Sequence, residues 1–223
     1  ILWHAAQQEP LGGGDMLTRR QFTFSGAAAF GAARTGFAAE VGDDGLQNNL
    51  GLDTFLELGD DLAAAADNGR HLMMLYEQNG CPYCRELHEV NFVRSELSDY
   101  IKVHYDVIQL DMFGAREVLD LDGQALEERD LAAKWGVNFT PTTILMHNSN
   151  AGAVSVSAAQ SFRMPGYLKP FHYLSSLEFV AERKFEEQTF QRYLQDKFAE
   201  LEAQGIDPDF GKALAFAALA SAA

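Results

Sequence analysis

The chain of 223 residues contains two cysteines, Cys81 and Cys84, and they stand three positions apart. A structural disulfide gains most of its stability by closing a long loop, whereas a bridge over two residues closes almost none. The spacing therefore favours a pair that opens and closes by thiol–disulfide exchange. The cysteine pair indicates the chemistry, and the elements on either side of it indicate the fold.

The pair lies between a predicted strand and a predicted helix. Residues 71–76 are an apolar run of strand length, and the turn signal Asn-Gly follows at 79–80. Pro82 suits the first position of a helix, where a missing N–H costs nothing. Cys81 would then stand at the helix N-terminus, where backbone N–H groups and the helix dipole favour a thiolate. We expect Cys81 to be the nucleophile and Cys84, one turn deeper on the same face, to be the resolving thiol.

Zinc binding and an inert local disulfide are the alternatives for this pair. With His88, the cysteines form a C-x2-C-x3-H pattern that could supply three zinc ligands. Tetrahedral zinc needs four ligands, or three and a water, and the sequence has no second Cys/His cluster. We therefore expect no metal and no cofactor, and we expect His88 to be an exposed helix residue.

Charge and hydropathy limit the partners of the chain. With 17 basic and 32 acidic residues, the net charge is −15, and such a surface would repel the phosphates of a nucleic acid. No apolar run reaches the roughly 18 residues that a membrane-spanning helix needs. We expect a globular protein that is not transmembrane and does not bind nucleic acid.

Residues 1–38 are predicted to be a leader. Arg19 and Arg20 precede a weakly apolar stretch at 25–33, and small residues up to Ala38 fit a cleavage site. This arrangement resembles a twin-arginine export signal that begins at Met16, and the alternatives are a general secretory signal or an ordinary basic N-terminus. We expect a periplasmic protein. An exported chain with one C-x-x-C pair and no other cysteine is best interpreted as an oxidoreductase or electron carrier.

The rest of the chain is predicted to form one domain. Residues 39–52 are a predicted linker, 53–203 the domain and 204–223 an Ala-rich tail. Within the domain the patterns predict helices at 53–67, after Cys81, at 126–135 and within 170–201, and strands at 71–77, 101–110, 142–147 and 153–157. This order gives an α/β fold with a central mixed sheet of about four strands flanked by helices, with added C-terminal helices. A C-x-x-C at the first strand–helix junction of such a unit is the thioredoxin-like motif.

A second part of the site is predicted at Thr140 and Pro141, just before the strand at 142–147. In thioredoxin-like folds, a cis-proline loop lies against the C-x-x-C, and the residue before the proline lends its backbone to a bound peptide. Pro141 matches that position, so we expect a cis bond, with Thr140 pairing with substrate by strand addition. Pro82 and Tyr83 complete the predicted substrate-binding set. The alternative is a trans proline that starts a strand.

Four segments carry a more specific resemblance. Residues 75–84 (LYEQNGCPYC), 88–92 (HEVNF), 135–142 (WGVNFTPT) and 165–171 (PGYLKPF) resemble SoxW-type thioredoxin-related proteins, which are associated with bacterial sulfur oxidation. The resemblance extends from about residue 54 to about residue 195. It implies a periplasmic dithiol–disulfide oxidoreductase that acts on cysteine-containing partner proteins and is recharged by a membrane electron donor of the thiol-reducing type.

The chain also departs from thioredoxin. Leu75 stands where thioredoxin has a buried acid that assists proton transfer; Glu77 could take that role, although we expect it to be an exposed carboxylate. Gly80 replaces a tryptophan, and Pro82-Tyr83 is the pair found in glutaredoxins. This pair predicts a shift toward an oxidising potential. The alternatives to a reductase are thus an oxidising DsbA-like protein, a glutaredoxin-like protein, or a non-catalytic binding module with a structural or zinc-bound C-x-x-C.

Overall fold

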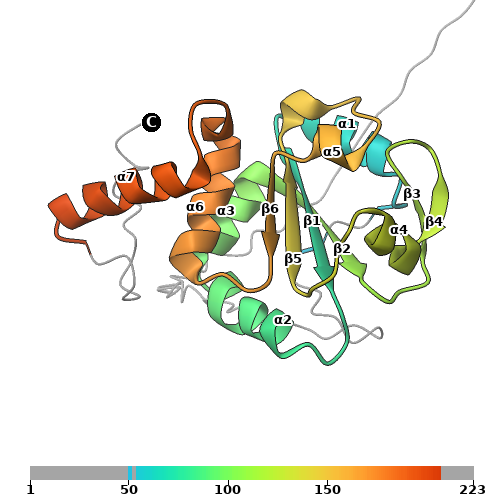
Figure 1. Cartoon of the computed structure of the whole chain (residues 1–223), viewed down its shortest axis with the longest axis horizontal. Helices are drawn as coiled ribbons and strands as arrows, with labels where there is room; N and C mark the ends of the chain where they lie inside the picture. Colours follow the sequence, from blue (N-terminus) through green and yellow to red (C-terminus); the bar gives the residue numbers. More distant parts are fainter. Residues whose placement is uncertain (1–49, 52–53, 207–223) are drawn as a thin grey trace, which may run out of the picture. The chain divides into compact units, whose positions relative to one another are not determined.

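The computed structural model describes residues 50–51 and 54–206 (Figure 1). The predicted leader, most of the predicted linker and most of the predicted tail lie outside the described residues.

A four-stranded mixed sheet forms the centre of the domain. Its strands, in the spatial order β2-β1-β5-β6, are Tyr105–Asp111, His71–Glu77, Thr142–Met146 and Phe162–Pro165. β1 pairs with β2 in parallel, and β5 pairs with β1 and β6 in antiparallel fashion. A parallel pair needs a long crossover. Here the crossover is helical and contains α2 (Pro82–Glu86), the π-helical η1 (Leu87–Phe92) and α3 (Ser95–His104).

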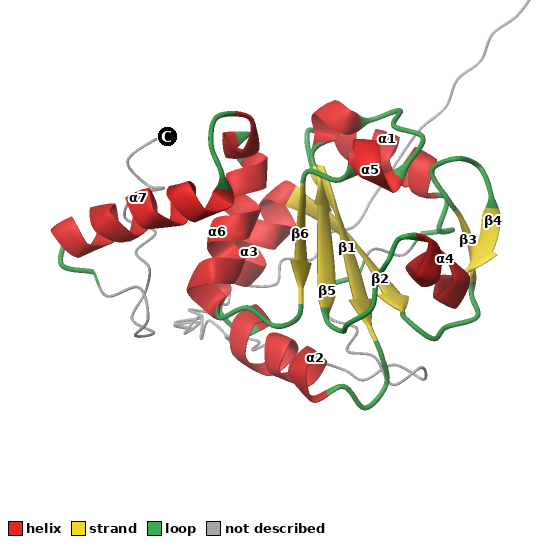
Figure 2. Cartoon of the chain, in the orientation of Figure 1, coloured by secondary structure: helices red, strands yellow, loops and turns green. Residues whose placement is uncertain are grey.

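Helices cover both faces of this sheet (Figure 2). Because successive side chains of a strand point to opposite faces, Met73 and Leu75 of β1 pack with residues of η1, α3 and α6 (Pro170–Ala181). Met74 points to the opposite face of the sheet, where it packs with a second group of buried residues that includes residues of α1 (Leu58–Asp67) and α4 (Glu128–Lys134). Every residue of β1 is buried. Since full burial of one large apolar side chain contributes about 1.5–3 kcal/mol, this strand anchors both halves of the core.

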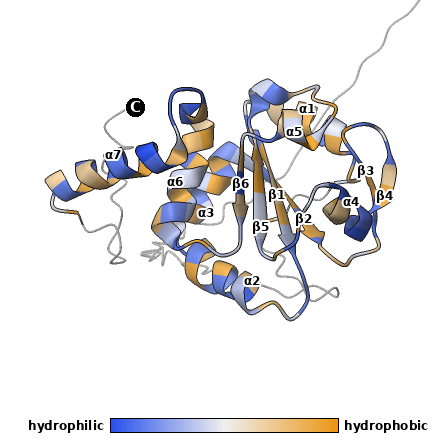
Figure 3. Cartoon of the chain, viewed as in Figure 1, coloured by the Kyte–Doolittle hydropathy of each residue, from blue (hydrophilic) through white to orange (hydrophobic). Residues whose placement is uncertain are grey.

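The remaining elements lie outside the central sheet. They are β3 (Glu117–Leu119) and β4 (Ala125–Glu127), which form a separate antiparallel pair, η2 (Asn148–Asn150), α5 (Val156–Ala159), η3 (Lys184–Glu186) and α7 (Phe190–Ala203). Apolar residues dominate the central strands, whereas polar and apolar residues alternate along α7 (Figure 3). None of the helices among the described residues combines the length and the apolar character that crossing a membrane requires.

The predicted fold class is confirmed, and two predicted strands are wrong in position. The central mixed sheet of four strands, its flanking helices and the C-terminal helices are all present. The strand predicted at 101–110 is helical up to His104, because Leu97 and Ile101 bury the same side of α3 at helical spacing. The strand predicted at 153–157 is absent. Ser155 caps the short α5 there by accepting from the N–H of Ala158, and the fourth strand is β6.

A pair of buried histidines at the start of β1 predicts acid sensitivity. The rings of His71 and His147 stack with centroids 4.4 Å apart, and His71 Nδ1 accepts a hydrogen bond of 3.1 Å from the backbone N–H of Asn148. Burial, followed by the positive charge that His147 and His104 can carry, lowers the pKa of His71 from 6.5 to about 4. The folded state therefore favours a neutral His71.

We expect the free energy of unfolding to decrease as the pH falls below 6.5. Between pH 6.5 and 4 the unfolded chain binds a proton at His71 that the folded chain does not, so this stability is complete above pH 6.5 and lost toward pH 4. The loss from this group is about 2 kcal/mol at pH 5. Urea unfolding of the wild type and of His71→Asn at pH 7.5 and pH 5 measures it, since asparagine keeps an acceptor for Asn148 but does not titrate. Equal pH dependence in both proteins would contradict the assignment.

Candidate redox site

The two cysteines stand at the turn from β1 into α2. Gly80 has a φ of 74°, a left-handed conformation that glycine adopts without strain, and it brings the chain into the helix. Cys81 is the N-cap of α2, Pro82 occupies its first turn, and Cys81 and Cys84 form a disulfide. The backbone N–H of Cys84 donates to Cys81 Sγ over 3.1 Å. This contact favours negative charge on Cys81 whenever the disulfide is open.

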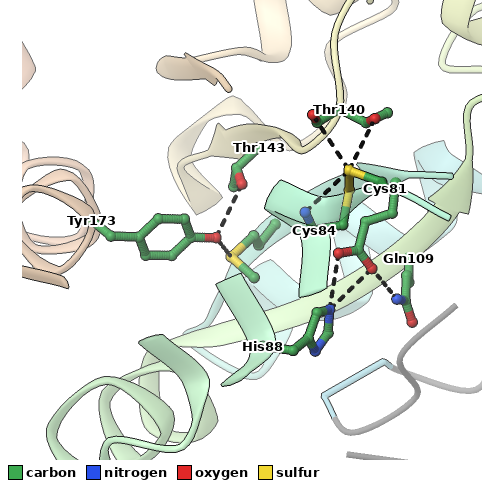
Figure 4. A network of polar contacts seen from close by, with 9 residues as sticks. Cys81, Cys84, His88, Gln109, Thr140, Thr143 and Tyr173 are labelled. Carbon is green, nitrogen blue, oxygen red and sulfur yellow. Dashed lines mark hydrogen bonds and ion pairs between the residues drawn. A yellow bond between two sulfur atoms is a disulfide. The ribbon is translucent and has the colours of Figure 1, made fainter. Parts of the chain in front are cut away.

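The Thr140–Pro141 loop lies against Cys81. The peptide bond between these residues is cis. Cys81 Sγ is 3.6 Å from the carbonyl oxygen of Thr140 and accepts a hydrogen bond of 3.4 Å from Thr140 Oγ1 (Figure 4). The structure thus brings together two predicted site segments that are 59 positions apart in the sequence.

The loop after β6 is the third segment of the site. The backbone N–H of Gly166 donates to the carbonyl oxygen of Pro141 over 2.7 Å. Tyr167 Oη donates to Asn91 Oδ1 over 3.0 Å, and this bond ties the loop to the helix that begins at the cysteines. Tyr167 and Asn91 have no role among the residues predicted from the sequence, although residues 165–171 and 88–92 form part of the SoxW-type resemblance.

The immediate surroundings of the disulfide differ in exposure. Cys81 and Cys84 are 9% and 4% exposed, while Tyr83 between them is 60% exposed and stacks on Tyr167 with ring centroids 6.5 Å apart. Phe139, next to Thr140, is also exposed. A partner protein that reached Cys81 would therefore meet aromatic surface around a mostly buried disulfide.

The expectation that Glu77 is an exposed carboxylate is wrong. Glu77 is the last residue of β1 and only 1% of it is exposed. Its Oε1 and Oε2 lie 2.9 and 3.1 Å from His88 Nε2, and Gln109 Nε2 of β2 donates to Oε2. Burying a carboxylate is costly unless hydrogen bonds satisfy it, and these two donors do so. Glu77 and Gln109 are diagonal neighbours on one face of the β1–β2 pair.

The expectation that His88 is an exposed helix residue is also wrong. His88 is 1% exposed, and its ring contacts Phe92 edge to face with centroids 5.0 Å apart. It follows Cys84 by four positions, which places both residues on the buried side of the same helical segment. The sequence pointed to His88 as a possible zinc ligand and as part of the SoxW-type resemblance, and nothing in it pointed to Gln109. Across the described residues, no group of three or more His, Cys, Asp or Glu side chains is placed to hold a metal ion.

The sheet, its helices and a C-x-x-C disulfide at a helix start together define a thioredoxin-like protein. The sequence profile of the family described as "Thioredoxin-like domain" matches residues 58–181, more than half of the chain. The chain therefore belongs to the thioredoxin-like domain family. Its cysteine pair has the spacing of a thiol–disulfide redox site.

Comparison with solved structures finds thioredoxin folds. A thioredoxin-fold protein from Helicobacter pylori is 21% identical, with a TM-score of 0.46, over 63% of this chain and 94% of that one. A thioredoxin from Thermus thermophilus is 22% identical, with a TM-score of 0.43, over 56% and 83%. The oxidised C-terminal domain of Neisseria meningitidis DsbD is 12% identical, with a TM-score of 0.40, over 59% and 99%. No curated protein matches the chain.

Proposed function

We propose that this protein is an exported thiol–disulfide oxidoreductase that reduces disulfides in partner proteins. The observation that carries the proposal is the environment of Cys81, whose sulfur receives the N–H of Cys84 and faces the backbone of Thr140. A helix N-terminus stabilises a thiolate, and a thiolate is the species that attacks a disulfide. The sulfur of Cys81 thus lies next to an N–H group that favours its thiolate and next to the backbone of Thr140, with which a substrate chain can pair.

In the proposed reaction, the Cys81 thiolate attacks one sulfur of the partner disulfide and releases the other as a thiolate. The mixed disulfide that results is attacked by Cys84, which forms the Cys81–Cys84 disulfide and releases the second partner thiol. Two electrons and two protons pass from the dithiol to the partner. Thr140 and Pro141 hold the partner chain by strand addition, and Pro82 and Tyr83 contribute contact surface.

Proton transfer is assigned to Glu77 in this proposal. Cys84 is buried and must lose its proton before it can attack the mixed disulfide. Glu77 is a buried carboxylate on the sheet face that this helix covers. Its burial and its hydrogen bonds support a role that an exposed carboxylate at this position would not fill.

The setting of the reaction comes from the sequence. The resemblance to SoxW-type proteins supports partners that are cysteine-containing periplasmic proteins, including proteins of sulfur oxidation, and a thiol-reducing electron donor in the membrane. The proposed organisation is a leader at 1–38 with a twin-arginine-type signal, a linker at 39–52, the domain at 53–203 and a tail at 204–223.

Equilibration of the cysteine pair with glutathione tests the direction of electron flow. We expect a reduction potential nearer to that of thioredoxin, about −270 mV, than to that of DsbA, about −120 mV. A value near that of DsbA would overturn the reductase and favour the oxidising alternative suggested by Pro82-Tyr83. Alkylation of the reduced protein tests the chemistry itself, because a structural or zinc-bound pair would react no faster than an ordinary thiol at neutral pH.

A further inference from the structure

A buried polar cluster beneath the cysteine helix consists of Glu77, His88 and Gln109. The three side chains come from three different elements: the end of β1, η1 and β2. His88 Nε2 donates to the Glu77 carboxylate, and Gln109 Nε2 donates to Oε2 of the same group. The carboxylate, rather than either neighbour, is the common acceptor of the cluster.

The helix that carries the cysteines also carries His88. Between Cys84 and His88 the helix changes from α to π, and the π segment runs from Leu87 to Phe92. Single π turns occur often at functional sites, where they change the direction of a side chain. His88 on this segment faces inward and contacts Glu77, while Cys84 is buried one turn earlier. Figure 4 shows the disulfide and His88 in one view, each with its own hydrogen-bond partners, and Tyr173 to one side.

The other polar groups near this cluster have different partners. Tyr173 of α6 shares a hydrogen bond of 3.0 Å with Thr143 Oγ1, and burial raises the pKa of Tyr173, with the charge of Glu77 as a further cause. Tyr173 therefore stays neutral at any pH at which thiol exchange is measured. Asn91, on the same helix, bonds to Tyr167 and to the carbonyl oxygen of Leu168. The hydrogen bond between Glu77 and His88 is therefore separate from the hydrogen bonds of Tyr173 and Asn91.

We propose that His88 is a positioning residue of the redox reaction: its Nε2–H holds the Glu77 carboxylate charged and oriented, so that this carboxylate can take the proton of Cys84. This inference rests on the proposed exchange reaction and adds to it a residue that the C-x-x-C motif does not contain. A hydrogen bond to the charged form of a buried acid favours that form, whereas burial alone would protonate it and remove the acceptor. Gln109 supplies the second donor.

The two steps of exchange can be separated with an aromatic disulfide. When the fully reduced protein is mixed with equimolar dithiobisnitrobenzoate in a stopped-flow instrument, attack by Cys81 releases one coloured thiolate and attack by Cys84 releases the second. In His88→Leu we expect the second phase to slow by about 10- to 100-fold at neutral pH, the effect of losing a hydrogen bond to a charged group. Its pH profile should shift to higher pH. The first phase should be unchanged, since the contacts of Cys81 are retained.

Three further variants make the result specific. His88→Gln keeps an N–H donor and should restore most of the rate of the second phase. Adding His88→Leu to Glu77→Gln should slow the second phase no more than about 2-fold beyond Glu77→Gln alone, because His88 acts through Glu77. Ser98→Ala is the control. It removes another buried polar group from the same helical crossover, in α3, and should leave the ratio of the two phases within about 2-fold of the wild type.

The outcomes distinguish this inference from the proposed function. A wild type whose first phase is no faster than a free thiol would contradict the proposed function. A wild type with two fast phases, together with an unchanged second phase in His88→Leu, would overturn the role of His88 and leave the function standing. Equal slowing of both phases in His88→Leu, or the same effect in Ser98→Ala, would also overturn it, because it would indicate a general loss of structure.

Discussion

Replacing Cys81 by serine is expected to reduce thiol–disulfide exchange to the uncatalysed background. Serine is nearly the same size as cysteine, so the N–H of Cys84 and the hydroxyl of Thr140 keep a hydrogen-bond acceptor at position 81. The serine hydroxyl does not lose its proton at neutral pH, and its oxygen cannot form a disulfide. Reduction of the insulin interchain disulfides in the presence of dithiothreitol, followed by turbidity, measures the loss. Circular dichroism of the same sample shows whether the fold is kept.

Cys84→Ser is the matched variant. It retains the attacking thiol and lacks the resolving thiol, so it should form a mixed disulfide with a protein substrate that persists until a reductant is added. The two variants together assign the order of attack, which the disulfide alone does not reveal. If Cys81→Ser forms the stable mixed disulfide and Cys84→Ser does not, the assignment of nucleophile and resolving thiol is reversed.

Substitution of Glu128 is expected to cause the largest loss of stability, because its side chain accepts hydrogen bonds from the segment between β2 and α4. Glu128 is buried, and its carboxylate accepts from the backbone N–H groups of Asp111 and Arg116 over 2.9 and 3.2 Å and from Arg116 Nη2 over 2.6 Å. A Cβ at Gly114 would clash with this carboxylate, which explains the glycine there. Glu128→Ala leaves backbone donors without an acceptor, at about 1–3 kcal/mol for each buried group.

We expect Glu128→Ala to lower the free energy of unfolding by about 3 kcal/mol, measured by urea unfolding at neutral pH. Asp130→Ala is the control, because Asp130 is exposed and stands with Glu128 in the acidic first turn of α4. Both substitutions remove a negative charge whose interaction with the helix dipole contributes about 0.3–1 kcal/mol. The difference between the two losses of unfolding free energy therefore measures the buried hydrogen bonds of Glu128. Similar losses in the two variants would show that the carboxylate of Glu128 contributes only through the helix dipole.

Local sequence patterns located the central elements well and their boundaries less well. The run at 71–77, the proline after Cys81 and the strand at 142–147 all predicted what the structure contains, because strand and helix periodicity are local properties. The first helix was predicted from residue 53 but begins at Leu58. Leu56 has a φ of 61°, and its carbonyl oxygen accepts the backbone N–H of Leu119. That contact with a distant segment overrides the helical pattern.

The sequence alone determined the cysteine pair, its place at the start of a helix and the α/β order of elements, since each depends on residues a few positions apart. Only the tertiary structure decided that Glu77 and His88 are buried against each other. Each, taken alone, has the polarity of a surface residue, and a buried carboxylate becomes favourable only when donors from η1 and β2 reach it. Those donors lie 11 and 32 positions away, and the crossover between β1 and β2 brings them together.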